Sequence, residues 1–527
     1  MSKSKWIDQK GPAAHHLPTI FENEARSSEI CRSHRAAEWR TGWGLISLLS
    51  ISIFVLLPTL ASSQTSSSDH LELGMQGQTM PSDLKIPVLP TPYSKGVLLV
   101  GHTTIWNRGG NMNMARIDSC AYVSSLPAKG PLVAYGGVRN PPDFSKDGVA
   151  VIDVSHPSNP TPVKVLRDKG SIYAVETIDA VAAPDRKVLI AGAYGGGQNP
   201  ADPEDAAWLD IYDASDCKNP RLMSEIKWPE NVHMVTLSPN GRRVYGTVIS
   251  PFTGKGGLNV LNISDMAHPK FIGKFGVTRP DGATFEFAVH EVSISPDERR
   301  IYAGVIASKG GDLNHDITAP PPSAEGLGPN AGGVYILDNS DIVDGLPDPK
   351  LRLVGTALHG GWHSPVRANI NGIPHLVSAG ELGACPGSWP KIVNIADEAH
   401  PYIEGEFKLQ MNHKENCPTP EGMEIATKGI VGRVGTAASH FNDVDSATGT
   451  RLGLFEFTWA GLRIADLHDP KSPVEVAYFK PGDACMSHVQ YLPKTGQVWF
   501  VCSASGFYVI ELKPELRASL GLPKVSY

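Results

Sequence analysis

The sequence is poor in charged and aromatic residues and has no concentration of positive charge. Of its 527 residues, 19% are charged and 7% are aromatic, and the formal net charge is -7 at pH 7. Nucleic-acid surfaces need clustered Lys and Arg, and no such run stands out in the repeat region, so we exclude a nucleic-acid partner. The chain is instead rich in Gly (53) and Pro (43). This composition is typical of β proteins with many turns.

Several motifs that would carry known chemistry are absent. The sequence contains no CxxC pair, which argues against a zinc site built from thiolates. It also contains no nucleophile elbow, no HExxH motif and no EF-hand loop. The glycines at 195–197 have neither the spacing nor the following helix of a phosphate-binding loop, which excludes a nucleotide site there.

One long hydrophobic run lies near the N-terminus. Residues 1–41 are polar, with several Lys and Arg, whereas 42–61 (GWGLISLLSISIFVLLPTLA) has no charge over about twenty residues, enough to cross a bilayer as a helix. Positive charge before the run predicts that the rest of the chain is exported, to the periplasm or the cell surface. The small residues around Ala61 suit signal-peptide cleavage, while the long leader suits an uncleaved anchor in the inner membrane. Both alternatives stay open, as does a buried core helix.

Export permits disulfides among the cysteines that follow the hydrophobic run. Those six are Cys120, Cys217, Cys385, Cys417, Cys485 and Cys502. Cys385–Cys417 and Cys485–Cys502 are the candidate pairs, because each pair lies within one repeat unit. The sequence does not fix the connectivity.

One motif recurs after a Pro- and Ser-rich linker at 62–95. Each copy is apolar and β-branched and ends in an acidic or amide residue suited to a turn, and the spacing of roughly 45 to 75 residues is that of propeller blades. The seven copies begin at Gly148, Trp208, Gly257, Gly333, Lys391, Gly461 and Gly506. Further strands before and after each copy predict four-stranded antiparallel meanders. The sequence thus predicts an all-β, seven-bladed β-propeller over 96–515, with a tail at 516–527.

The last copy has no clear fourth strand after Glu511-Leu512. An orphan strand at 96–102 (GVLLVGH) precedes the first copy and resembles the outer strand at 351–360 (LRLVGTALHG). We therefore predict that this N-terminal strand completes the final blade, which removes most of the exposed sheet edge.

The phrase G-L-x-I-x-D-x-S-x-P, followed by an outer strand, resembles the LVIVD repeat of exported bacterial and archaeal proteins. The resemblance covers residues 96–515. Two copies depart from it: Pro390-Lys391 replaces the leading Gly of the fifth, and Glu511 replaces the Asp of the seventh. The resemblance implies a propeller and a surface or secreted protein, and it implies little about activity.

A histidine occurs at the start of the predicted innermost strand in five repeats. These are His233, His290, His363, His440 and His488. Innermost strands line the axial channel of a propeller, so the five imidazoles are expected to converge at one mouth, as ligands suited to iron, copper or zinc. The alternative is structural, because such histidines can simply hydrogen-bond within or between blades. Blades one and two have Asn113 and Tyr173 at this position.

Other residues extend the predicted site. His102 and His359 follow related outer strands, and we expect both to return to the same mouth. Glu291 is expected to orient ligands or to transfer protons, as is Asp443. Arg367, on an inner strand, either binds an anionic substrate or pairs with an interior carboxylate.

Short stretches such as 232–248 (VHMVTLSPNGRRVYGTV) are also similar to the inner strands of the selenium-binding protein and methanethiol oxidase propellers. Together these features predict an exported propeller with one transition-metal ion, iron or copper rather than zinc, that acts on a small molecule by redox chemistry. The alternative is a non-catalytic surface protein that binds a ligand or a protein partner through its loops. An uncleaved N-terminal segment would add the membrane as a partner.

Overall fold

The computed structural model describes residues 68–78, 88–126, 144–193, 207–230, 232–250, 255–305, 332–358, 363–380, 389–416 and 439–525. All of them belong to the compact unit Ser66–Tyr527. The predicted hydrophobic segment 42–61 lies outside the described residues. In the part of the chain that is described, no helix combines the length and the apolar character needed to span a membrane.

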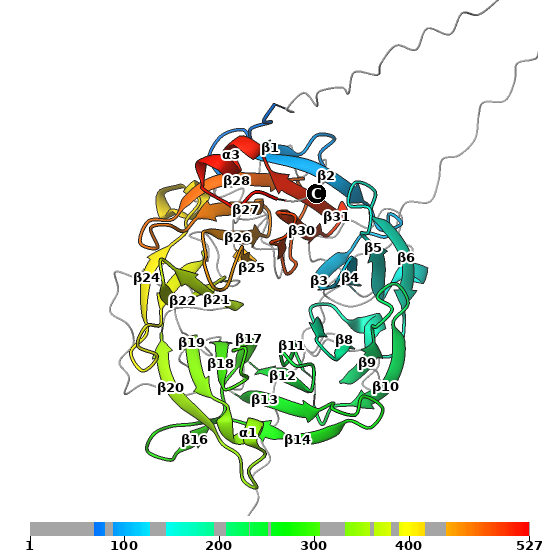
Figure 1. Cartoon of the computed structure of the whole chain (residues 1–527), viewed down its shortest axis with the longest axis vertical. Coiled ribbons are helices and arrows are strands. Elements are labelled where there is room, and N and C mark those ends of the chain that lie inside the picture. Colours follow the sequence, from blue (N-terminus) through cyan, green and yellow to red (C-terminus); the bar gives the residue numbers. More distant parts are fainter. Residues whose placement is uncertain are drawn as a thin grey trace, which may run out of the picture. The chain divides into compact units, whose positions relative to one another are not determined.

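The strands form seven sheets around a common axis, which confirms a seven-bladed β-propeller (Figure 1). Blade one contains, from the axis outward, β3 (Asn111–Ile117), β4 (Cys120–Ser125), β5 (Val149–Asp153) and β6 (Thr161–Leu166). Blade two contains β7 (Ile178–Ala183), β8 (Arg186–Gly192), β9 (Trp208–Asp213) and β10 (Arg221–Lys227). Blade three contains β11 (Val235–Leu237), β12 (Arg243–Ser250), β13 (Lys255–Asn262) and β14 (Lys270–Phe275).

Blade four contains β17 (Val289–Ile294), β18 (Arg300–Val305), β19 (Gly333–Asp338) and β20 (Leu351–Ala357), extended by β15 (Val277–Thr278) and β16 (Thr284–Phe285). Blade five contains β21 (Pro365–Ile370), β22 (Ile373–Ser378), β23 (Lys391–Asn394) and β24 (Tyr402–Glu406). Blade six contains β25 (Ser439–Val444), β26 (Leu452–Phe457), β27 (Gly461–Asp466) and β28 (Val474–Lys480), extended by β1 (Tyr93–Lys95). Blade seven contains β29 (Gln490–Leu492), β30 (Gln497–Cys502), β31 (Gly506–Leu512) and β2 (Val97–Thr103).

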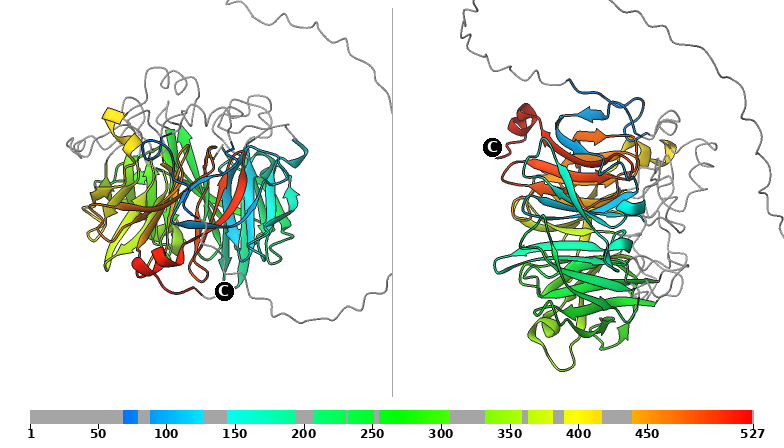
Figure 2. Two further views of the ribbon diagram at one scale, coloured as in Figure 1. Left: turned by 90° about the horizontal axis from the view of Figure 1, so that it is seen from above. Right: turned by 90° about the vertical axis from the view of Figure 1, so that its right-hand side faces the viewer.

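Strands distant in sequence meet in blade seven. β2 pairs antiparallel with β31, with Val97 opposite Leu512 and Thr103 opposite Phe507. The short helices α1 (Ser340–Asp344) and α3 (Pro514–Ser519) lie in a blade-four turn and after β31. Figure 2 shows from the side that the strands run between the two faces of the ring.

The recurring sequence motif forms the third strand of each blade. These strands are mostly apolar because both of their faces are covered, as in β5 and β19, where every residue but the last is buried. Residues of adjacent blades share one core: Tyr245 and Leu258 of blade three pack in the same cluster as Ile301 and Tyr335 of blade four. A mainly apolar sequence is thus typical of a strand that lies between two blades.

Glycines in the outer strands let neighbouring blades approach closely. Gly355 in β20 directly follows a bulged residue, and a Cβ on it would lie 2.1 Å from the carbonyl oxygen of Glu398 in the next blade. Gly405 in β24 also follows a bulged residue, and a Cβ on it would lie 2.0 Å from the carbonyl oxygen of Pro470 in blade six. Gly101 in β2 of blade seven likewise follows a bulged residue, and a Cβ on it would lie 2.0 Å from the carbonyl oxygen of Pro157 in blade one. No side chain fits at these contacts.

We predict that Gly355→Ala destabilises the propeller by about 1–3 kcal/mol, because the added methyl group forces two blades apart. Gly449→Ala is the control, since a Cβ there would meet no heavy atom within 4 Å. The measurement is the midpoint of denaturant unfolding. Equal midpoints for the two variants would contradict this account of blade packing.

A buried arginine ties the segment 68–78 to blade six. Arg463 is 0% exposed, and its guanidinium donates to both carboxylate oxygens of Glu72, at 2.7 and 2.9 Å. Glu475 lies 3.1 Å from the same group. Burial alone would raise the pKa of Glu72, but the hydrogen bonds and charge of Arg463 hold that pKa below its usual value. The segment therefore supplies a charge that blade six needs.

We predict that Glu72→Ala costs about 3–5 kcal/mol of stability at neutral pH, because it removes a partner from a buried charge. The folded-state pKa of Glu72 is depressed, so its contribution is present above its unfolded pKa of about 4.5 and lost as the pH falls below that value. The difference between wild type and variant should shrink in acid. Glu230→Ala, which breaks a half-exposed pair with Lys274, should cost less than about 1 kcal/mol.

Two disulfides occur among the described residues. Cys485–Cys502 lies within blade seven and confirms one candidate pair. Cys120–Cys217 joins β4 of blade one to the turn after β9 of blade two. This pair was not predicted, because the candidate pairs were chosen within single repeats. The candidate pair Cys385–Cys417 lies outside the described residues and stays a prediction.

Candidate metal centre

The inner strands bring their first residues to one mouth of the channel. His233 lies just before β11, and His290 is the second residue of β17. Neighbouring blades are joined at this level, because the Thr177 hydroxyl donates to the carbonyl of His233 and the Thr247 hydroxyl donates to that of His290, both at 2.8 Å. The backbone that carries each imidazole is therefore fixed by the preceding blade.

Four of the predicted histidines form a continuous cluster around one carboxylate. Nε2 of His233 lies 2.8 Å from Nε2 of His290. The rings of His290 and His363 lie 3.8 Å apart, and those of His363 and His440 lie 4.5 Å apart. Glu176 places one oxygen 3.4 Å from Nε2 of His233 and the other 3.6 Å from Nε2 of His440. All five side chains are buried.

Glu176 was missed by the sequence analysis. It precedes β7 by two residues, as His233 precedes β11, and so it takes the position that we assigned to Tyr173. Tyr173 instead belongs to a 3-10 turn, Ser171–Tyr173. Asn113 occupies the position in blade one, as expected. Its side chain donates to the carbonyl of Glu176 and accepts from the backbone N–H of His488.

The donor atoms have the spacing of metal ligands. Glu176, His233 and His290 form one set whose donor atoms all lie within 4.8 Å of one another, and Glu176, His363 and His440 form another. Two donors bonded to one ion at about 2.0–2.1 Å, at angles of 90–110°, lie about 2.8–3.4 Å apart. The 2.8 and 3.4 Å separations around His233 match this range. Two imidazoles with one carboxylate are a set typical of non-haem iron.

Glu291 and His488 form an ion pair beside the cluster. Nε2 of His488 lies 2.6 Å from one oxygen of Glu291. The other oxygen accepts a hydrogen bond from Ser364, whose hydroxyl lies 2.8 Å from Nδ1 of His363. His488 is therefore paired with Glu291 and is not part of either donor set. Contacts at Nδ1 orient the His363 ring so that Nε2 is its ligand atom.

The ion pair of Glu291 and His488 consists of a carboxylate and a protonated imidazole. Burial alone would raise the pKa of Glu291, but the charge and hydrogen bonds of His488 and His363 hold that pKa well below its usual value. Burial likewise acts to lower the pKa of His488, and the Glu291 carboxylate raises it above its usual value. The interaction thus keeps a proton on His488.

We predict that Glu291→Gln lowers the pKa of His488, because burial then acts without the carboxylate that opposes it. NMR titration of the imidazole in metal-free protein measures the shift. Glu230→Gln, a change at the half-exposed pair with Lys274, should leave the pKa of His488 unaltered. An unchanged His488 pKa in the Glu291 variant would show that the pair does not set this protonation state.

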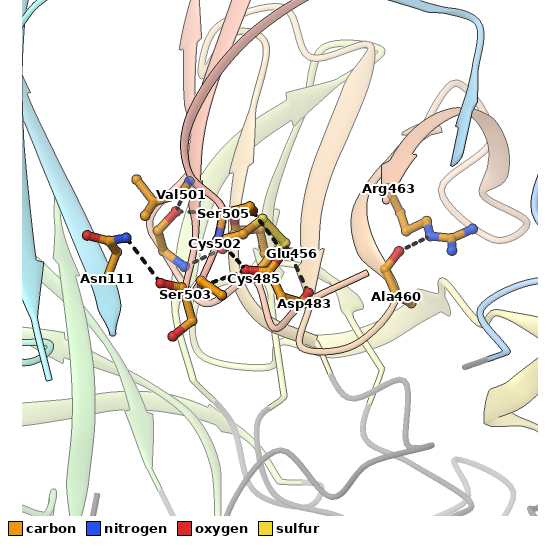
Figure 3. Close-up of a disulfide and its surroundings, with 12 residues drawn as sticks. Asn111, Glu456, Ala460, Arg463, Asp483, Cys485, Val501, Cys502, Ser503 and Ser505 are labelled. Carbon is orange, nitrogen blue, oxygen red and sulfur yellow. Dashed lines mark hydrogen bonds between the residues drawn. A yellow bond between two sulfur atoms is a disulfide. The ribbon is translucent and has the colours of Figure 1, made fainter. Parts of the chain in front are cut away.

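The backbone before His488 is held from several sides (Figure 3). The Cys485–Cys502 disulfide links it to β30. The Asp483 carboxylate accepts hydrogen bonds from the hydroxyl and the backbone N–H of Ser505, both at 2.8 Å. His488 is therefore presented on a rigid segment.

The other predicted residues lie away from the cluster. His102 is on β2, three strands outward from the inner strand of its blade and so about 14 Å away. Its Nε2 lies 2.7 Å from the carbonyl oxygen of Ser505, and its ring stacks on Tyr508. The expectation that His102 reaches the mouth is wrong, because an outer strand ends at the rim. His359 lies outside the described residues.

Arg367 lies on the inner strand β21, four residues after His363 and so about 13 Å further along the channel. It is half-buried, and its charge acts on the hydroxyl of Tyr302 in blade four. Anion binding by Arg367 stays a prediction.

A cavity of about 230 Å³ adjoins the ion pair. Its lining includes Arg116, Asp179, Glu291 and His488. Burial raises the pKa of Asp179 to about 6, although its carboxylate accepts the backbone N–H of Leu237 at 2.7 Å. Polar groups from several blades thus face one small space next to the cluster.

Comparison with known proteins gives one family match. Residues 144–165, which include β5, match the model of the LVIVD repeat. No curated protein matches the chain. Among solved structures, hydrazine synthase from Kuenenia stuttgartiensis is similar, with 11% identity, a TM-score of 0.44, and coverage of 76% of this chain and 96% of that one. None of these matches bears on the selenium-binding resemblance, which stays a prediction. Residues 144–165 are thus an LVIVD repeat, set in a seven-bladed β-propeller.

Proposed function

We propose that this propeller is an exported, metal-dependent enzyme that acts on a small molecule at the axial cluster. The observation that carries the proposal is the convergence of Glu176 with four imidazoles from four other blades. Structural histidines need only hydrogen-bond to neighbouring backbone or side chains. Here donor atoms from five blades, including a carboxylate, gather in one place, at distances that also suit coordination of a metal ion.

The donor set favours iron. Imidazole suits iron, copper and zinc, and a carboxylate beside two imidazoles is typical of non-haem iron(II). Among the described residues, the two donor sets consist of imidazoles and a carboxylate, without a cysteine thiolate that would favour copper(I). A bound ion of this kind supplies Lewis acidity and, for iron or copper, one-electron redox chemistry.

The chain's own residues supply proton handling and positioning. Glu291 keeps a proton on His488, which lines the cavity and so faces a molecule bound there. The hydrogen bonds from Glu291 through Ser364 to His363 fix the orientation of a ligand ring. Burial of the cluster excludes bulk water and strengthens the electrostatic interactions within it.

The disulfides support the export part of the proposal. Cys120–Cys217 and Cys485–Cys502 require an oxidising compartment in which to form and persist. This agrees with the positive leader and the hydrophobic segment at 42–61. A periplasmic or cell-surface location follows, with the membrane as a partner if that segment is retained.

We expect the purified full chain to contain iron or copper by elemental mass spectrometry. The double variant His290→Ala/His440→Ala removes one imidazole from each donor set and should lose at least nine-tenths of the metal. His268→Ala/His400→Ala, which changes two exposed turn histidines, should retain it. A metal-free wild type, or equal metal content in both variants, would refute the proposal.

A further inference from the structure

A second ring of side chains follows the cluster along the inner strands. It lies three residues after the ligand position in blades one to four: Arg116, Asp179, Thr236 and Ser293. Three residues of extended strand span about 10 Å. This partial ring therefore covers four of the seven blades at a level beyond the cluster, away from the mouth.

These four residues all line the 230 Å³ cavity, together with Glu291 and His488. Glu291 also lies 3.4 Å from Nδ1 of His363, so one side chain separates the cavity from the cluster. His363 and His440 are fully buried, whereas His488 exposes 22% of its side chain. His488 thus combines partial exposure with a place in the lining of the cavity.

The cavity wall carries polar atoms suited to a ligand. The hydroxyl of Ser293 and Nε of Arg116 are buried and have no hydrogen-bond partner within the part of the chain that the structure describes. Asp179 and Glu291 add carboxylates. Donors and acceptors therefore face the same space, and its volume is below the 300–1,000 Å³ of pockets for drug-sized ligands.

We infer that this cavity is the substrate pocket and that its occupant reaches the cluster from the strand side rather than from the histidine mouth. The occupant is a small polar molecule with both a hydrogen-bond donor, for Asp179, and an oxygen acceptor, for Arg116 and Ser293. This inference rests on the proposed function and specifies the substrate class and route for that site.

The test uses azide as a small ligand of the metal in the full, metal-loaded chain. Ser293→Phe fills the cavity and should slow azide binding at least tenfold, while metal content stays at the wild-type level. Ser264→Phe, which adds the same ring in an exposed turn after β13 and outside the cavity, should bind azide as the wild type does. Absorbance of the azide complex in stopped flow measures the rate, and elemental analysis measures the metal.

Unchanged azide binding in Ser293→Phe would overturn the route while leaving the metal centre intact. If that variant loses its metal or fails to fold, Ala180→Leu fills the same cavity and decides the question by the same criterion. Glycolate should slow azide binding to wild type more than propionate does, because only glycolate carries a hydroxyl donor. If glycolate and propionate slowed azide binding equally, the inference that the occupant carries a hydrogen-bond donor would be overturned. A wild type without metal would instead refute the proposed function, and this inference with it.

Discussion

Close packing between neighbouring blades is the constraint on which the rest of the structure depends. In β2, β20 and β24, a glycine after the outer-strand bulge lets a turn of the next blade approach the backbone directly, as at Gly355 and Glu398. Fixed contact at the rim sets the angle between blades, and that angle determines where the inner strands meet. The imidazoles of separate repeats can then lie with rings 3.8 to 4.5 Å apart.

The channel has a layered chemistry that follows from strand geometry. Side chains at the start of the inner strands of blades two to six form a buried set of nitrogen and carboxylate donors. In blades one to four, the side chains three residues later are polar and line the cavity. Glu291 and His488 connect the two levels. Residues at the same position of each repeat thus lie at the same depth in the channel. The residue types at one depth can differ from those at the next.

The fold could be predicted from the sequence because the same strand motif recurs once in every blade. Seven apolar motifs with turns and flanking strands sufficed for the propeller, and four clustered histidines followed from their shared position. Glu176 was missed for two reasons. A 3-10 turn at Ser171–Tyr173 changes the number of residues before the inner strand of blade two. The repeats were also matched by their histidines, and blade two has a carboxylate at that position. His102 was misplaced because it lies on an outer strand, and the sequence pattern does not show how far from the axis its side chain remains. Cys120–Cys217 was missed because it joins two repeats.

The contact between Glu176 and His440 has a consequence for how the molecule unfolds. In arrays of repeats each unit usually touches only its neighbours, so stability is a sum of local terms and ends can fray independently. Glu176 of blade two and His440 of blade six lie 3.6 Å apart across the axis. Blades that are remote along the ring thereby share an interaction, and opening one of them disturbs the other. The axial cluster therefore makes unfolding more cooperative than contacts between neighbouring blades alone would make it.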